Sequence, residues 1–108
     1  MGEYTTEEID QKLALLVESE RRALVRILQE SEADRVSTRE IVHRLQESDL
    51  TRDEDDHIAI AVCHNHLPKL DAADVVEYDS ASEMVRYDGD ELVETLLESI
   101  SEIRRTAG

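Results

Sequence analysis

One short segment holds most of the side chains that could bind a metal ion. His57, Cys63, His64 and His66 follow one another closely, and imidazole and thiolate groups are the usual ligands of zinc. On one helix, however, Cys63 and His64 point about 100° apart, so the segment cannot supply a tetrahedral ligand set by itself. The chain has no second cysteine. We therefore predict no metal site, and we expect His66 to be a hydrogen-bonded, partly buried residue and Cys63 to be a small core residue.

The sequence indicates no catalytic site. A Cys–His dyad needs the two side chains to meet in space beside a third group that orients them, and adjacency in the sequence does not provide this. No glycine-rich phosphate loop is present. Carboxylates are so numerous that pairs of them carry no information. We therefore predict that the protein is not an enzyme and needs no cofactor.

Length and composition favour one small aliphatic domain. A chain of 108 residues can form a single core, and its only aromatic residues are three tyrosines. No apolar run is long enough to span a bilayer, and the N-terminal residues lack the basic and apolar regions of a signal peptide. One cysteine excludes an internal disulfide. We expect a cytoplasmic protein that does not enter the membrane.

Acidic residues dominate the surface chemistry. The chain has 27 Asp and Glu against 12 Lys and Arg, a net charge of −15, and only two of the basic residues are lysines. This balance resembles the proteins of salt-loving archaea, whose cytoplasm screens carboxylate repulsion because the Debye length in molar salt is about 3 Å. An ordinary acidic protein is the alternative. The acids are spread along the chain rather than confined to a tail, which favours the halophile.

Apolar spacing predicts helices along most of the chain. Ile9, Leu13, Leu16 and Val17 share one helical face after Thr5 and Thr6. Ser19 is expected to cap a second helix, and Ser37–Glu40 has the pattern of a capping box before a third. The predicted helices are about 6–17, 19–29, 38–45, 53–72 and 90–105. Asp53 to Asp56 would favour the positive end of the fourth helix.

Residues 76–87 change from helical to alternating spacing. Val76 and Tyr78 alternate, as do Val85 and Tyr87, around the polar segment 79–83, which predicts a β-hairpin. The expected fold is therefore mainly α-helical with a small β-hairpin.

Three segments resemble known winged-helix proteins. Residues 20–28 are similar to the second helix of arsenic-repressor-like regulators, 36–41 to the entry of their next helix, and 66–76 to the exit from their recognition helix into the wing. The chain most resembles haloarchaeal winged helix-turn-helix domains that contain a segment like 64–70. The resemblance implies a single winged-helix domain over 1–108, with a core of about 8–88 and additional N- and C-terminal helices. The chain departs from the family pattern at two places: the turn before the recognition helix is long and acidic, and Asp74 stands where glycine is usual.

The resemblance implies a transcriptional regulator that binds double-stranded DNA. Cys63, Leu67 and Leu70 would face the core, and the opposite helix face would contact DNA. The expected DNA-binding residues are Thr38, Arg39, His57, Ala61, His64, Asn65, Lys69 and Arg86. The alternative is a winged-helix module that binds proteins and not DNA, which the net negative charge favours.

The outer helices predict a homodimer. Apolar residues of the first and last helices extend beyond the winged-helix core, and a small domain has few surfaces to cover them. The expected dimer residues are Ile9, Leu13, Leu16, Leu96, Ile100 and Ile103. The alternative is that the two helices cover each other within one chain.

The charge balance predicts a salt-dependent fold. Carboxylate repulsion at low ionic strength opposes a modest aliphatic core, so the thermal midpoint is expected to rise between 0.1 M and 2 M KCl. Circular dichroism over a KCl series measures this. Equal midpoints at both concentrations would contradict the halophile interpretation.

Overall fold

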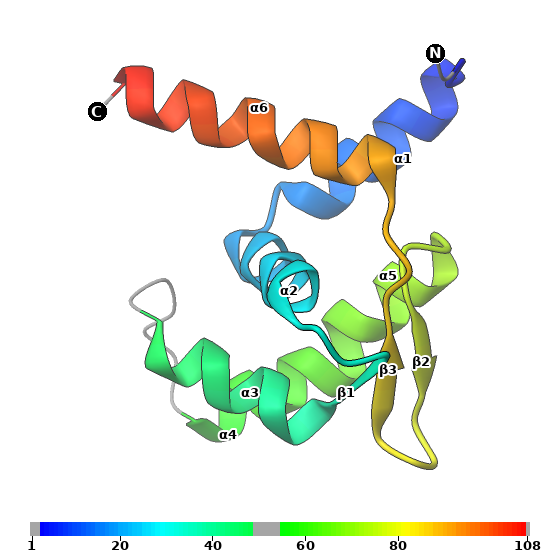
Figure 1. Cartoon of the computed structure of the whole chain (residues 1–108), viewed down its shortest axis with the longest axis vertical. Coiled ribbons are helices and arrows are strands. Elements are labelled where there is room, and N and C mark those ends of the chain that lie inside the picture. The colour runs from blue at the N-terminus through cyan, green and yellow to red at the C-terminus, as the bar shows by residue number, and fades with distance from the viewer. Residues whose placement is uncertain (1–2, 49–54, 108) are drawn as a thin grey trace.

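A computed structural model describes residues 3–48 and 55–107 as a mainly helical chain with a three-stranded sheet (Figure 1). The acidic turn expected before the recognition helix falls on residues 49–54, which lie outside the described residues, as do Asp53 among the expected capping acids and the side chains of Asp55 and Asp56. The elements are α1 (Thr6–Leu16), α2 (Ser19–Glu30), β1 (Arg35–Ser37), α3 (Thr38–Glu47), α4 (Asp55–Ala61), a π-helical turn η1 (Val62–His66), α5 (Leu67–Ala72), β2 (Glu77–Asp79), β3 (Met84–Arg86) and α6 (Glu91–Ala107). Since α4, η1 and α5 run on without a break, this is the winged-helix order with a further helix at each end.

Side-chain caps start two of the predicted helices. Thr5 Oγ1 accepts the Glu8 N–H at 3.1 Å at the start of α1, and Ser37 Oγ accepts the Glu40 N–H at 3.1 Å at the start of α3. In a capping box the Glu40 carboxylate would also accept the Ser37 N–H. The bond described for this carboxylate is instead the one that it accepts from Arg44. The prediction for α2 was wrong in detail, because Ser19 is its first helical residue and no side chain caps it.

The sheet extends the predicted hairpin by one strand. β2 and β3 pair antiparallel, as the alternation predicted, and the register places Tyr78 opposite Val85. β1 pairs antiparallel with the other edge of β3, so the strand order is β1-β3-β2. β1 was not predicted, because its three residues are too few to establish an alternating pattern.

The turn from α5 into the hairpin explains Asp74. The Val75 N–H bonds to Leu70 O and the Asp74 N–H to Asp71 O, each at 2.9 Å, which is the hydrogen-bond pair of a Schellman motif. Asp74 occupies the left-handed position with φ of 60°. Glycine adopts this conformation most easily, and aspartate tolerates it better than most residues.

One aliphatic core joins the helices to the sheet. Its largest fully buried side chains are Leu16, Leu24, Ile41, Leu45, Ile58, Leu67, Leu70 and Leu97. Val85 brings the centre of the sheet into the same cluster. Among the described residues, no helix is long and apolar enough to cross a membrane.

The terminal helices pack against each other, which corrects the predicted dimer surface. α6 lies across α1 in Figure 1, and the two helices are in contact. Leu16 is 1% exposed within its own chain, so it is unavailable to a partner. Leu96 and Ile100 are half-buried against the same core. Ile9 is half-buried, whereas Leu13 and Ile103 remain exposed.

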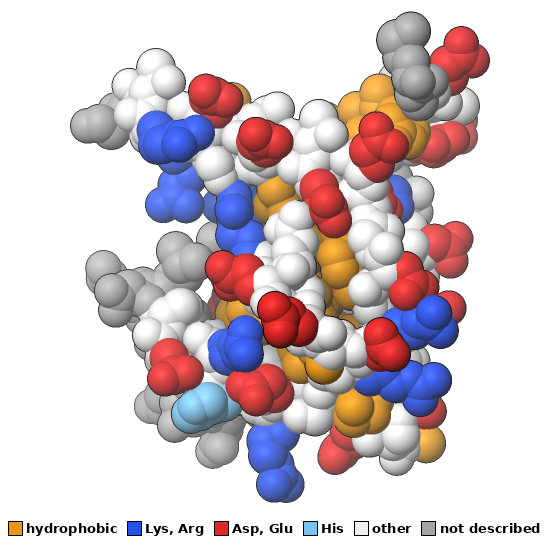
Figure 2. Space-filling view, in the orientation of Figure 1, with side chains coloured by type: hydrophobic (Ala, Val, Ile, Leu, Met, Phe, Trp, Pro, Cys, Tyr) orange, Lys and Arg blue, Asp and Glu red, His pale blue; other side chains and the backbone are white. Residues whose placement is uncertain are grey.

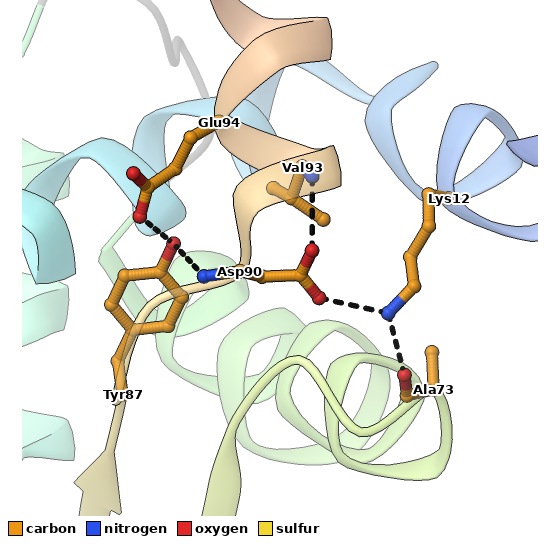
Figure 3. A network of polar contacts seen from close by, with 6 residues as sticks. All are labelled: Lys12, Ala73, Tyr87, Asp90, Val93 and Glu94. Atoms are coloured by element: carbon orange, nitrogen blue, oxygen red, sulfur yellow. Dashed lines mark hydrogen bonds and ion pairs between the residues drawn. The ribbon is translucent and has the colours of Figure 1, made fainter. Parts of the chain in front are cut away.

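A network of polar contacts fixes the start of α6 (Figure 3). Asp90 Oδ1 accepts the Val93 N–H at 3.0 Å and so caps the helix, while Asp90 Oδ2 pairs with Lys12 Nζ at 2.9 Å. The Lys12 ammonium also donates to Ala73 O at 2.8 Å. One lysine therefore connects α1, the residue after α5, and the first turn of α6.

Tyr87 extends this network to the end of the hairpin. Its hydroxyl donates to Glu94 Oε2 at 2.6 Å and accepts the Asp90 N–H at 3.1 Å. Burial and the Glu94 carboxylate both raise the pKa of Tyr87 well above its ordinary value. The phenol thus stays a hydrogen-bond donor, and it joins the hairpin to α6.

The Lys12 junction predicts an unequal effect of the two lysines on stability. Lys12→Met leaves the half-buried Asp90 carboxylate and Ala73 carbonyl without their cation, so we expect unfolding to become easier by about 2 kcal/mol. Lys69→Met, at an exposed lysine, is the matched control and should change stability little. Urea unfolding in 2 M KCl compares them. Equal losses in the two variants would contradict the structural role of Lys12.

Candidate nucleic-acid interface

The predicted recognition helix is one continuous run from α4 through η1 to α5. In η1 the Leu67 N–H bonds to Val62 O, five residues earlier, which widens the turn. Pro68 follows immediately and has no N–H to offer to the carbonyl four residues before it. The sequence predicted the helix, and the π turn beside its proline could not be read from apolar spacing.

The π turn changes which residues face the core. Leu67 and Leu70 are fully buried, as predicted. Cys63 is only half-buried, so its assignment to the core was wrong. The extra residue in the turn places Ile58 and Val62 on the buried face instead.

The predicted DNA-facing side chains lie mostly on the exposed face of this helix. His57, His64, Asn65 and Lys69 are exposed, and Ala61 is half-buried. Ile60 shares this helix and is 58% exposed, which the sequence analysis did not anticipate. An exposed imidazole, amide and ammonium on one helix provide hydrogen-bond donors and acceptors for base edges and phosphates.

The exposed face has a charge property that the sequence analysis overlooked. No Asp or Glu occurs from residue 57 to residue 70, although the whole chain has 27 among its 108 residues. The described surface of the helix is therefore neutral to basic until Asp71. This gap in the acidic residues can be read from the sequence. It was missed because the run of acids from Asp53 to Asp56 comes directly before it.

A buried polar junction holds the middle of the helix. His66 is 3% exposed. Its Nε2 lies 3.1 Å from Glu20 Oε2, and its Nδ1 lies 3.4 Å from Arg21 Nη1. Because the guanidinium can only donate, His66 Nδ1 accepts from Arg21, and the His66 Nε2–H donates a hydrogen bond to Glu20 Oε2. His66 is thus the hydrogen-bonded residue that the sequence predicted, and it is more deeply buried than expected.

Arg21 transmits this junction to the first helix. Its guanidinium is buried, and Nε donates to Leu15 O at 2.6 Å near the end of α1. The recognition helix is therefore tied to the turn between α1 and α2 by hydrogen bonds as well as by its apolar side chains. A helix positioned in this way can present its outer face without reorganising.

The two residues predicted at the start of α3 have different environments. Thr38 is 5% exposed, and its N–H donates to Glu83 O at 3.0 Å in the hairpin tip. Its side chain is thus a poor candidate for contacting a ligand, contrary to expectation. Arg39 is exposed and forms no ion pair with the described residues. It remains available to a phosphate.

The wing is more acidic than the helix. Arg86 pairs with Asp88 at 3.0 Å, and this contact raises the pKa of Arg86 further above its ordinary value. Glu77 lies opposite Arg86 on β2, and Glu83 is exposed in the tip. Figure 2 shows basic and acidic side chains side by side at the lower right, where the sheet lies in Figure 1. Arg86 must leave Asp88 before it can contact a phosphate.

Cys63 lies beside the wing. It lines a depression of about 420 Å³ together with Ala59, Arg39 and Glu83 of the hairpin tip, so one carboxylate of the wing lies beside this part of the helix. Burial and the Cys63 thiol raise the pKa of Tyr78, whose strand packs near this point. Within the part of the chain that the structure describes, no group of three or more His, Cys, Asp or Glu side chains could hold a metal ion.

Comparison with known proteins identifies the family. The family model described as "Domain of unknown function (DUF7344)" matches residues 13–86, a range that runs from α1 to the end of β3. The chain belongs to this family. No curated protein and no solved structure matches the chain.

Proposed function

We propose that this member of the family is a DNA-binding transcriptional regulator of a salt-loving archaeon, which acts in the cytoplasm by binding and needs neither a cofactor nor catalysis. The observation that carries the proposal is the exposed helix face from residue 57 to residue 70, which has no carboxylate in a chain of net charge −15. Acidic residues anywhere on this face would repel phosphates in the groove. The resemblance to winged-helix regulators supports the same assignment.

The helix would enter the major groove with its exposed polar side chains toward the DNA. An α-helix fits the major groove, where the Asn65 amide can form a bidentate contact with adenine. His64 and Lys69 are exposed on this helix, and the exposed Arg39 lines the same depression as Cys63 of the helix; these three residues are the proposed phosphate contacts. The junction at His66 supports the proposal because it fixes the rotation of this helix against α2.

The wing has a smaller part in this proposal than the resemblance alone implies. Its arginine is already paired, and three nearby carboxylates, those of Glu77, Glu83 and Asp88, would need screening before the hairpin could approach a phosphate. Molar salt provides that screening. Salt therefore weakens phosphate contacts and permits the approach of the wing, so the net salt dependence of affinity should be shallower than for an ordinary DNA-binding protein.

One observation favours the alternative of a protein-binding module. Ile60 is exposed at 58% on the recognition helix. Exposed apolar side chains on a helix are typical anchors for a protein partner. A partner bound there would occupy the same helix face as DNA, so the two functions exclude each other at this site.

The DNA proposal predicts distinct effects of two substitutions. Asn65→Ala should cost about 1–3 kcal/mol on the preferred sequence only, because it removes a base contact. Arg39→Ala should weaken binding to all sequences by a similar factor, because it removes a phosphate contact. Fluorescence anisotropy with genomic promoter fragments in 1–3 M KCl measures both.

A third variant separates the two functions. Ile60→Ser retains every proposed DNA contact and should leave DNA affinity nearly unchanged, whereas it should abolish capture of a protein partner. If folded wild-type protein binds none of the fragments at any salt concentration, the DNA proposal is wrong and the protein-binding alternative stands.

Self-association through the outer helices belongs to the same proposal, on a smaller surface than the sequence indicated. Leu13 and Ile103 are exposed on α1 and α6, and winged-helix regulators commonly bind two half-sites as dimers. Light scattering in 2 M KCl at tens of micromolar should report a dimer, and Ile103→Glu should convert it to a monomer. Glu102→Gln, at the neighbouring exposed residue, is the control. A wild-type monomer under these conditions would refute self-association.

A further inference from the structure

We propose that the groove between α2 and α6 binds the terminal phosphate of a small phosphorylated molecule. This site is separate from the exposed face of the recognition helix, and the inference does not depend on DNA binding. It is carried by arginines that converge on one recess without a carboxylate among them.

The recess is small and basic. Its volume is about 30 Å³, and Arg22, Arg26 and Arg104 line it together with Ser19 and Ser101. Arg22 and Arg26 come from α2, and Arg104 comes from the last turns of α6. Figure 2 shows basic side chains gathered on the left of the view, beneath the C-terminal part of α6. No Asp or Glu lines the recess.

Two of the guanidinium groups are held in place by the backbone. Arg22 Nη1 donates to Leu16 O at 2.6 Å and to Val17 O at 3.1 Å. Arg26 Nη2 donates to Leu97 O at 3.3 Å and to the Ser101 hydroxyl. A guanidinium has five N–H donors, so each arginine keeps unused donors after these bonds. The groups are therefore fixed in orientation and still able to bind an anion.

Among the residues that the structure describes, none of these arginines forms an ion pair with a carboxylate. The described ion pairs of the other arginines are Arg44 with Glu40 and Arg86 with Asp88, and no described carboxylate pairs with Arg22, Arg26 or Arg104. The three positively charged guanidinium groups repel one another where they line the recess. A bound anion removes that repulsion and satisfies the free N–H donors.

The dimensions of the recess select the kind of anion. A volume of about 30 Å³ admits roughly two water-sized groups, which corresponds to the outer oxygens of an oxyanion. A terminal phosphate can insert these oxygens and form bidentate bonds to arginine. A phosphate within a DNA duplex carries a sugar on both sides and cannot enter to the same depth.

The recess opens into a wider groove that would hold the rest of the ligand. The groove has a volume of about 790 Å³ and shares Arg26, Ser101 and Arg104 with the recess. Its further lining includes Glu94, Glu98 and Gln29. Glu94 accepts from Tyr87 through Oε2, whereas Glu98 is exposed, so Glu98 is the more accessible of the two acceptors for ligand hydroxyl or amino groups. A phosphorylated sugar has the matching chemistry.

The test follows the arginine side chains directly. Inorganic phosphate and ribose 5-phosphate are titrated into ¹⁵N-labelled full-length protein in potassium glutamate at constant ionic strength, and the Nε–H signals are recorded by NMR. We expect saturable shifts for Arg22, Arg26 and Arg104. Arg104→Gln should weaken phosphate binding about tenfold. Arg105→Gln should weaken it less than twofold, since Arg105 is on the same helix but lines only the outer groove.

The remaining arms test the ligand class. Glu98→Gln should lower the affinity for ribose 5-phosphate but leave the affinity for inorganic phosphate unchanged. If the wild-type protein binds both ligands equally and the variant changes neither affinity, the sugar assignment is wrong. Shifts that never saturate, or equal losses in the two arginine variants, would show charge screening instead of a site. Chloride and a DNA duplex are titrated in the same way. Shifts that saturate with chloride but do not respond to phosphate would contradict the assignment of the recess to an oxyanion. Shifts of the same arginines with the duplex would assign the groove to DNA.

Discussion

Carboxylate repulsion is the constraint to which the surface of this protein must conform. With 27 acidic residues and 12 basic ones on a small domain, carboxylates far outnumber the cations that could pair with them, and each ion pair removes only a small part of the repulsion. Surfaces without acids are therefore the informative ones. Residues 57–70 of the helix contain no Asp or Glu, and no Asp or Glu lines the recess between α2 and α6. The first supports binding of DNA, and the second supports binding of a phosphate ester.

Buried polar contacts give this acidic domain a defined shape. Among the described residues, no buried side-chain nitrogen or oxygen lacks a hydrogen-bond partner. Two junctions control the recognition helix: His66 ties its middle to α2, and Lys12 ties the residue at its end to α1 and α6. Ion pairs at partly buried sites are screened less by salt than exposed ones. The helix thus remains positioned at ionic strengths that weaken surface attractions.

The sequence predicted those features that depend on local pattern. Apolar spacing identified the helices, alternation identified the hairpin through Tyr78 and Val85, and Ser37 was recognised as a cap because its signal lies within four residues. Features that depend on tertiary contact were missed. β1 is too short to show a period, and the π turn arises where Pro68 meets the packing of the helix. Arg26 and Arg104 form one recess although they lie far apart in the chain, and the burial of Leu16 depends on where α6 crosses α1.

We propose that DNA binds to the exposed surface of helix residues 57–70, which include no carboxylate. The proposal can be tested by recording backbone amide shifts by NMR in molar KCl while a duplex that contains the preferred promoter fragment is added. We expect the largest shifts at residues 57–69 and at Arg39, with smaller shifts in β2 and β3. Shifts absent from the recognition helix, or confined to α1 and α6, would contradict it.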